Sequence, residues 1–223
     1  MILAIDTSGE NCGVALWRKE LIGFRVVSEK LRHNEVLFTQ IKSILTDFDV
    51  KVDSLSAVAV SSGPGSFTGL RVGMAAAKGL CWAWKLPFIA VPTLEGLAEA
   101  VPPRIKRVLA LMPARATEVY WALFENVEGK WLRQTEDQVS DVSHLRDACR
   151  TEIFLFGEGY DKHRSLLDNL FAGQRITLNH GARVDALAVS TARLAENRFA
   201  EGRYDDLMET EPKYCYAFPR RKS

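Results

Sequence analysis

The feature that most limits how this chain can fold is a repeated order of predicted strands and helices. Apolar runs and their spacing predict three strands, a helix, a strand, a helix, a strand and a helix over residues 1–100, and the same order over residues 105–200. The openings of the two halves also match, with "ILAI" and "VALW" in the first and "VLAL" and "WALF" in the second. The repetition predicts a duplicated α/β lobe.

The consecutive prolines of "VPPR" mark the junction between the two halves. Proline lacks a backbone N–H and clashes with the preceding turn, so the helix predicted over residues 93–100 cannot continue through Pro102 and Pro103. We expect one lobe in residues 1–103 and another in residues 104–223. Two tandem lobes, each a mixed sheet with flanking helices, facing each other across a cleft, describe the actin-like, RNase H-like (ASKHA) architecture that sugar kinases share.

Composition and charge exclude several classes of protein. The chain has 223 residues and is 47% hydrophobic, enough to fill the core of one large or two small units. Its 29 basic and 28 acidic side chains give a net charge of +1, too balanced to hold a polyanion by a general field. Four widely spaced cysteines predict reduced structural thiols. With neither a signal peptide nor a long apolar run, we expect a cytoplasmic protein without membrane contact.

A polar turn after the first strand offers half of a phosphate clamp. In the actin-like architecture, the hairpin after the first strand of each lobe holds phosphate through backbone N–H groups and hydroxyls. Asp6, Thr7 and Ser8 could form the first side as a vestigial phosphate-binding turn. At the equivalent point of the second half, Pro113 supplies neither a carboxylate nor an N–H. An alternative remains open, in which the short polar side chains only close the hairpin.

Motifs for catalysis are missing from the sequence. The segment "GPGSFTGL" matches neither the GxxxxGK[ST] nor the GxGxxG pattern, and there is no GxSxG elbow. The histidines show no paired ligand spacing; they are His33, His144, His163 and His180. We therefore expect no catalytic residues, no metal site and no cofactor beyond weak nucleotide binding.

The segment "SSGPGSFTGLRVGMAAAKGL" has helical apolar spacing from residue 67 to residue 84, with Ser66 as the N-cap. Each glycine inside this helix costs about 1 kcal/mol relative to alanine, so we expect something to approach its backbone closely. A stripe of small residues recurs every fourth position, at Gly69, Gly73, Ala77 and Cys81. Two explanations stay open: packing inside the chain's own lobe, or docking of another subunit.

The helix predicted over residues 33–48 strengthens the docking explanation. It combines the polar pattern "HNEVLFTQI" with Leu37, Phe38 and Ile41, which is more apolar surface than one inward stripe needs. An unpaired apolar face of this kind predicts self-association when the true partner is missing.

Several motifs in this order resemble the bacterial TsaB (YeaZ) family: "MILAIDTS" with "VALW", then "RHNEVL", "GPGSFTGLRVG", "VPTLEGLA" and "EVYWALF". The resemblance implies an actin-like, non-catalytic relative of the subunit TsaD. Such a protein binds TsaD through its first-lobe helices and supports the attachment of threonylcarbamoyl to the adenosine beside the anticodon of tRNAs that read codons starting with A. It further implies that the small ATPase TsaE joins the assembly and that tRNA is contacted only indirectly. The homodimer that we expect without TsaD follows from the unpaired apolar face of the first-lobe helices.

The resemblance places the partner surface on the first-lobe helices, at or near His33, Glu35, Phe38, Phe67, Thr68, Leu70, Arg71, Met74 and Lys78, and the small-residue stripe adds Gly69, Gly73 and Ala77. Three departures from the family pattern stand out. Family members usually have an aspartate where this chain has Pro113, a serine where it has Asn34, and Leu-Arg after the tyrosine of "EPKY". The first argues further against a nucleotide held between the lobes, and the last leaves open what the C-terminal segment contacts.

Two further functions compete with a scaffold. A small-molecule kinase or ATPase of the same fold with a degenerate nucleotide site is the main alternative, and Pro113 argues against it. A direct RNA-binding module would need a basic, aromatic surface. We expect the aromatic candidates to pack in cores instead; they are Trp82, Trp84, Trp121 and Trp131.

Overall fold

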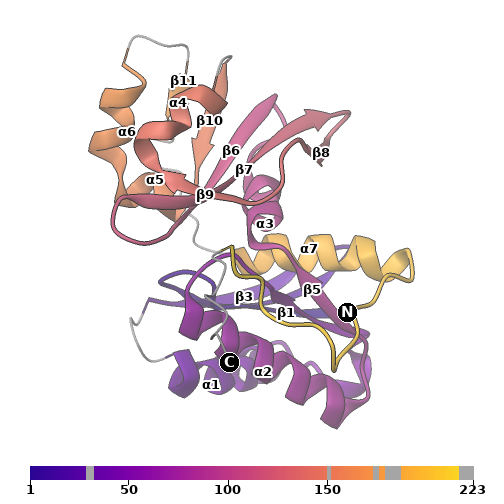
Figure 1. The fold of residues 1–223 in the computed structure, drawn as a ribbon. Helices are drawn as coiled ribbons and strands as arrows, with labels where there is room; N and C mark the ends of the chain where they lie inside the picture. The colour runs from indigo at the N-terminus through magenta and orange to yellow at the C-terminus, as the bar shows by residue number, and fades with distance from the viewer. Residues whose placement is uncertain (29–32, 150–151, 173–175, 179–186, 216–223) are drawn as a thin grey trace.

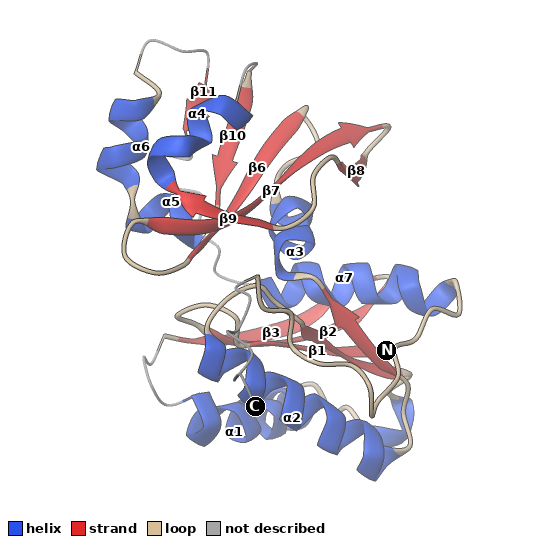
Figure 2. Cartoon of the chain, in the orientation of Figure 1, coloured by secondary structure: helices blue, strands red, loops and turns tan. Residues whose placement is uncertain are grey.

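Two β-sheets with equivalent strand orders form the centres of the two lobes (Figures 1 and 2). The computed structural model describes residues 1–28, 33–149, 152–172, 176–178 and 187–215. The first sheet has the order β3-β2-β1-β4-β5. Its strands are β1 (Ile2–Asp6), β2 (Cys12–Arg18), β3 (Glu20–Val27), β4 (Ala57–Ser61) and β5 (Phe88–Val91). Strands β1, β2 and β3 form the predicted antiparallel meander, and β4 and β5 run parallel to β1.

The second sheet repeats this arrangement in the order β11-β10-β6-β7-β8. Its strands are β6 (Arg107–Pro113), β7 (Glu118–Val127), β8 (Lys130–Arg133), β10 (Ile153–Phe156) and β11 (Ile176–Leu178). Strands β6 and β7 are antiparallel, and β10 and β11 run parallel to β6. An additional strand, β9 (Gln138–Asp141), pairs with β7. The shared topology confirms the predicted duplication.

Helices cover both faces of the first sheet, because alternate residues of each strand point to opposite faces. One face packs against α1 (His33–Asp47) and α2 (Phe67–Trp84). The other packs against α7 (Leu187–Ala200), and small side chains on both sides let this helix lie close to the sheet. The alanines of this contact are Ala4, Ala15, Ala57, Ala59, Ala188, Ala192 and Ala195.

The last helix of each repeat covers the sheet of the other repeat. Helix α3 (Thr93–Ala100) packs on the second sheet, whose opposite face carries Leu167 of α6 (Arg164–Leu170), while α7 packs on the first sheet. Helices α3 and α7 also contact each other between the lobes (Figure 1). The structure therefore corrects the division at residue 103. The prolines end a repeat of the sequence, but the exchange of α3 and α7 builds each lobe from both halves.

Most predicted elements of the first half lie where the sequence placed them. Helix α2, strand β5 and helix α3 begin and end at the predicted residues. Val101 is extended before Pro102, with φ −79° and ψ 135°, as the proline requires. A short 3₁₀ helix, Val52–Ser54, precedes β4.

The second half differs from its prediction in more places. The hairpin at Gly129 is confirmed, with positive φ at Glu128 and Gly129. The single helix predicted over residues 141–150 is wrong: a 3₁₀ helix, Val142–His144, leads into the short α4 (Leu145–Ala148). Helix α5 (Glu158–Lys162) and strand β9 were not predicted. Residues 150, 174–175 and 184–186, where predicted elements began or ended, lie outside the described residues.

After α7 the chain returns along the first lobe as an extended segment, residues 201–215 (Figure 1). Asp205 pairs with the edge strand β5: its N–H donates to the carbonyl of Phe88 at 2.9 Å, and its Oδ2 accepts from the N–H of Ala90 at 2.7 Å. Further along, the Lys213 N–H donates to the Ser62 carbonyl at 2.7 Å. The segment thus covers a sheet edge that would otherwise expose unpaired backbone groups.

Candidate functional site

The turn between β1 and β2 is held by its own hydrogen bonds. Asp6, Thr7 and Ser8 are all buried. The Oδ1 atom of Asp6 accepts from Ser8 N at 3.3 Å and from Ser8 Oγ at 2.7 Å, and Thr7 Oγ1 donates to the carbonyl of Gly69 at 2.6 Å. These contacts favour the explanation in which short polar side chains close the hairpin. A phosphate-binding role for the three residues stays a prediction.

The small-residue stripe of α2 packs against this turn. Gly69, Gly73, Ala77 and Cys81 are buried within the first lobe. A Cβ at Gly69 would collide with the carbonyl oxygen of Thr7, and a Cβ at Gly73 would collide with its Oγ1. The glycines therefore admit a close approach, as predicted, but the approaching backbone belongs to the same lobe. The hypothesis that this stripe docks another subunit is wrong.

The opposite side of α2 faces solvent, because residues three and four apart share one side of a helix. We call the exposed side of α1 and α2 the outer face; its residues are Phe38, Phe67, Thr68, Arg71, Ala75, Gly79 and Trp82. Phe38 is 54% exposed and Trp82 is 74% exposed. A Cβ at Gly79 would have no neighbour within 4 Å, so the surface of α2 at this position is open.

The structure divides the predicted partner surface in two. Phe38, Phe67, Thr68 and Arg71 belong to the outer face, and the half-buried Lys78 lies on the same side of α2. The remaining α2 residues of the prediction are buried and cannot form a surface contact; they are Gly69, Leu70, Gly73, Met74 and Ala77. His33 and Glu35 lie in the first turn of α1, and their side chains lie outside the described part of the chain.

Sequence reasoning missed three residues of the outer face. Ala75, Gly79 and Trp82 follow one another at spacings of four and three residues, which is the spacing of one helix face. Trp82 was expected in a core, and its exposure corrects that prediction. These three residues could have been found from the sequence as the side of the helix opposite the stripe of small residues.

The C-terminal segment ends against the start of α2. The ring of Tyr214 lies 5.2 Å from the ring of Phe67, centroid to centroid, and Arg71 Nε donates to the Tyr214 hydroxyl at 3.1 Å. The Arg71 guanidinium lies 3.9 Å from the Phe67 centroid, a cation–π contact. Ser66 caps the helix as predicted, its Oγ accepting from Gly69 N at 3.2 Å. The "EPKY" segment therefore adjoins the outer face; residues 216–223 lie outside the described residues.

A pocket of about 430 Å³ opens between the lobes. Its lining residues are Gly65, Ser66, Phe67, Pro113, Ala114, Arg115, Tyr120 and Tyr214. Pro113, at the end of β6, has no backbone N–H to donate into this pocket. Pro113 therefore cannot donate the backbone hydrogen bond to a phosphate oxygen that the second half of a phosphate clamp would need at this position.

A carboxyl group of the second lobe lies on the first-lobe turn. Glu158 Oε2 accepts from the N–H of Glu10 at 3.2 Å, and a Cβ at Gly9 would collide with the same carboxyl. Burial, chiefly, raises the pKa of Glu158 to about 7; the Glu10 N–H opposes this shift, and the charges of Asp6, Glu10 and Asp161 add to it. Glu158 therefore accepts from a backbone N–H beside the turn for which phosphate binding was predicted.

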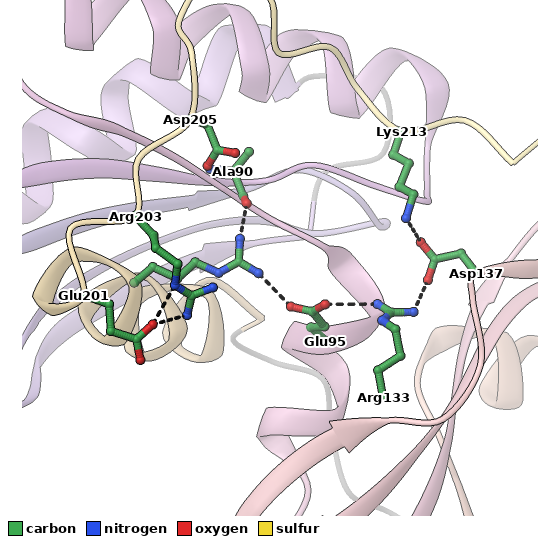
Figure 3. Close-up of polar contacts among 9 residues, drawn as sticks. Ala90, Glu95, Arg133, Asp137, Glu201, Arg203, Asp205 and Lys213 are labelled. Atoms are coloured by element: carbon green, nitrogen blue, oxygen red, sulfur yellow. Dashed lines mark hydrogen bonds and ion pairs between the residues drawn. The ribbon is translucent and has the colours of Figure 1, made fainter.

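A chain of ion pairs links the lobes on another side (Figure 3). Glu95 of α3 pairs with Arg198 at 2.8 Å and with Arg133 at 3.3 Å. Arg133 pairs in turn with Asp137 at 2.5 Å, and Asp137 pairs with Lys213 of the C-terminal segment at 2.9 Å. The Asp137 side chain is only 2% exposed, and Arg133 and Lys213 compensate its buried negative charge.

Thiols and possible metal ligands are two further kinds of group among the described residues. All four cysteines are free, and burial raises the pKa of Cys12, Cys81 and Cys149 to about 12, which keeps them protonated. No three His, Cys, Asp or Glu side chains of the described residues gather closely enough to hold a metal ion. None of the described helices combines the length and apolar character needed to cross a bilayer.

Two facing lobes with duplicated sheets and exchanged helices define the actin-like class. An inorganic polyphosphate/ATP-glucomannokinase from Arthrobacter shares this fold, with a TM-score of 0.51 at 15% identity, covering 88% of this chain and 98% of the kinase. YeaZ from Pseudomonas aeruginosa superimposes with a TM-score of 0.80 at 25% identity, covering 96% of this chain and 98% of YeaZ.

Sequence comparison gives the family. Residues 26–215 match the family model described as TsaD, tRNA N6-adenosine threonylcarbamoyltransferase. The tRNA threonylcarbamoyladenosine biosynthesis protein TsaB of Escherichia coli K12 is 32% identical over 219 residues, covering 96% of this chain and 93% of that protein. TsaB of Bacillus subtilis is 32% identical over 174 residues, covering 76% of each. The chain belongs to the TsaB (YeaZ) family.

Proposed function

We propose that this chain is a non-catalytic subunit in the biosynthesis of tRNA threonylcarbamoyladenosine in the cytoplasm. It binds TsaD and supports the transfer of threonylcarbamoyl to the adenosine next to the anticodon of tRNAs that read codons starting with A. TsaE joins this assembly, and tRNA reaches the chain only indirectly. Family membership supports the proposal, because the curated relatives are named for this biosynthesis and the matched family model is that of TsaD.

The observation that carries the proposal is the outer face. On α2 the exposed ring of Trp82 shares one helix face with the small residues Ala75 and Gly79, and α1 exposes the ring of Phe38. Exposed aromatic side chains next to a flat helix surface suit burial against a partner helix, and a soluble monomer gains nothing by exposing them. We place TsaD on this face, and a second copy of the chain on it when TsaD is absent.

The cleft between the lobes supports a non-catalytic role. The polar side chains of the β1–β2 turn are engaged inside the chain, Glu158 lies on that turn, and Pro113 stands at the matching point of the second lobe. The alternative, a small-molecule kinase or ATPase with a degenerate site, predicts ATP turnover by the isolated chain that Asp6→Ala abolishes. We expect no turnover and no resident cofactor, with weak nucleotide binding at most in the TsaB–TsaD–TsaE assembly.

The docking proposal is tested by adding bulk to the outer face without disturbing the fold. In Gly79→Leu, the new side chain enters open space and suits a helix better than glycine does, so folding is preserved. We expect its affinity for TsaD of the same organism, measured by calorimetry, to fall about tenfold or more, because the leucine holds the partner away.

The matched control is Ser165→Leu, which places the same leucine side chain at an exposed position of α6 in the second lobe. We expect this variant to bind TsaD as the wild type does. Wild-type affinity in Gly79→Leu would contradict docking through the outer face.

A further inference from the structure

The C-terminal segment connects the second lobe to the start of α2. Lys213 Nζ pairs with Asp137, which lies between β8 and β9 of the second lobe, and the next residue, Tyr214, packs on Phe67 and Arg71 of the first lobe. Consecutive Cα atoms are only about 3.8 Å apart, so a contact that holds Lys213 limits where Tyr214 can lie.

The second-lobe end of this connection is a firm anchor. Asp137 is almost completely buried and is held by Arg133, whose guanidinium also pairs with Glu95 (Figure 3). The same guanidinium lies 4.8 Å from the ring centroid of Phe124. Moving a buried carboxylate away from its cations leaves an uncompensated charge, which is strongly unfavourable. Asp137 therefore offers Lys213 a fixed point.

The first-lobe end fits as closely. The Lys213 N–H donates to the Ser62 carbonyl at 2.7 Å. Gly63 has φ +109°, and a Cβ there would collide with the carbonyl oxygen of Lys213, so the segment lies directly on the turn that leads into α2. From this position Tyr214 reaches Phe67 with its ring and Arg71 with its hydroxyl.

We propose that Asp137 is a positioning residue for the outer face: through Lys213 it sets Tyr214 against Phe67 and Arg71, so that the second lobe shapes the surface which TsaD meets. The inference rests on the proposed function, because it adds Tyr214 to the TsaD-binding surface. Stacking between Tyr214, Phe67 and Arg71 orders three side chains before binding, and a partner then has less side-chain entropy to remove.

The first measurement follows the ring contact itself. In the wild type, we expect nuclear Overhauser effects between the rings of Tyr214 and Phe67, whose centroids lie 5.2 Å apart. We expect them to weaken or vanish in Asp137→Asn, and also in Lys213→Met, which removes the same ion pair from its half-exposed end and leaves the buried cluster in place. The control is Glu201→Gln, which breaks an exposed ion pair with Arg203 in the same segment and should leave the ring contact unchanged.

The second measurement is a double-mutant cycle on TsaD affinity. Asp137→Asn, Lys213→Met and Tyr214→Ala should each weaken binding about fivefold, the worth of one cation–π contact or hydrogen bond. In a Tyr214→Ala background, Lys213→Met should cause little further loss, because its effect passes through Tyr214. A purely structural role would instead give additive losses.

The outcomes separate this inference from the proposed function. Failure of the wild type to bind TsaD would overturn both. If the wild type binds TsaD, two results would overturn the positioning role alone. One is an intact contact between the rings of Tyr214 and Phe67 in both Asp137→Asn and Lys213→Met. The other is additive losses of affinity in the double-mutant cycle.

Discussion

At the scale of single residues, two glycines of one helix have opposite surroundings. Gly73 faces Thr7 with no room for a side chain, whereas Gly79 faces open space. Gly73 is therefore required by packing inside the first lobe, and no packing inside the described chain requires Gly79. Each glycine lowers the stability of the helix relative to alanine, but only at Gly73 does a close contact within the lobe offset this cost.

This difference predicts opposite effects of the same substitution. Gly73→Ala should lower the free energy of unfolding by about 1–3 kcal/mol, because the added methyl group overpacks a site with no space. Gly79→Ala should raise it by up to about 1 kcal/mol through helix propensity. Urea denaturation of the two variants checks the prediction, and equal shifts in the two would contradict it.

At the scale of elements, the C-terminal segment completes the edge of the first sheet. Strand β5 is the last strand in the order of its sheet, and Asp205 pairs with it through both a backbone and a side-chain group. The Asp205 carboxylate accepts the N–H of Ala90, a buried residue whose donor would otherwise lack this acceptor. The segment is therefore a structural part of the first lobe.

Asp205→Ala should lower the free energy of unfolding by about 1–3 kcal/mol, the cost of leaving a buried N–H without its acceptor. Hydrogen exchange at the Ala90 amide should become faster in the same variant. The control is Asp206→Ala, which removes an exposed carboxylate that accepts from Met208 N and Glu209 N. It should cost less, because water replaces those contacts, and it should leave the Ala90 amide unchanged.

At the scale of the whole molecule, the lobes meet through titratable groups. Glu158 is directed across the cleft by its neighbours: Gly157 has φ +117°, and Cβ atoms at Gly157 and Gly159 would collide with the backbone of Leu111. Because Gly157 and Gly159 pack directly against β6, the Glu158 carboxyl lies at the N–H of Glu10. This one contact between the lobes therefore includes a side chain whose pKa, about 7, lies near neutral pH.

The pKa of Glu158 rises from 4.5 to about 7 on folding, so between these values the folded chain binds more protons than the unfolded chain does. The stability that neutral Glu158 contributes is complete below pH 4.5 and is lost as the pH rises to about 7. Glutamine does not ionise, so Glu158→Gln should not show this decrease in the free energy of unfolding as the pH rises. Its stability relative to the wild type should increase by about 1–2 kcal/mol across this window, a value reduced for partial exposure.

Urea denaturation at pH 4.5 and at a pH above 7 measures this difference. The control is Glu152→Gln, at the exposed opposite end of β10, for which the difference from the wild type should not vary in the same way. A constant difference between Glu158→Gln and the wild type would show that Glu158 has an ordinary pKa in the folded chain.

The sequence by itself determined the duplicated lobe, the helix over residues 67–84 with its Ser66 cap, the hairpin at Gly129 and the close approach to Gly69 and Gly73. These features follow from local periodicity and backbone geometry, which residues close together in the sequence determine. The polar strand β9 and the short α5 escaped prediction because pairing with β7 and packing on β6 form them, and neither partner is near in sequence.

Only the tertiary structure decided which side of α2 is free. The small-residue pattern shows that something must come close, but it cannot tell the Thr7 backbone from a second polypeptide. Nor can it place Glu158 on the Glu10 N–H or Lys213 on Asp137, because these contacts join residues that are far apart in sequence. The physical reason is that periodicity assigns residues to a face, whereas the folding of the whole chain determines what covers that face.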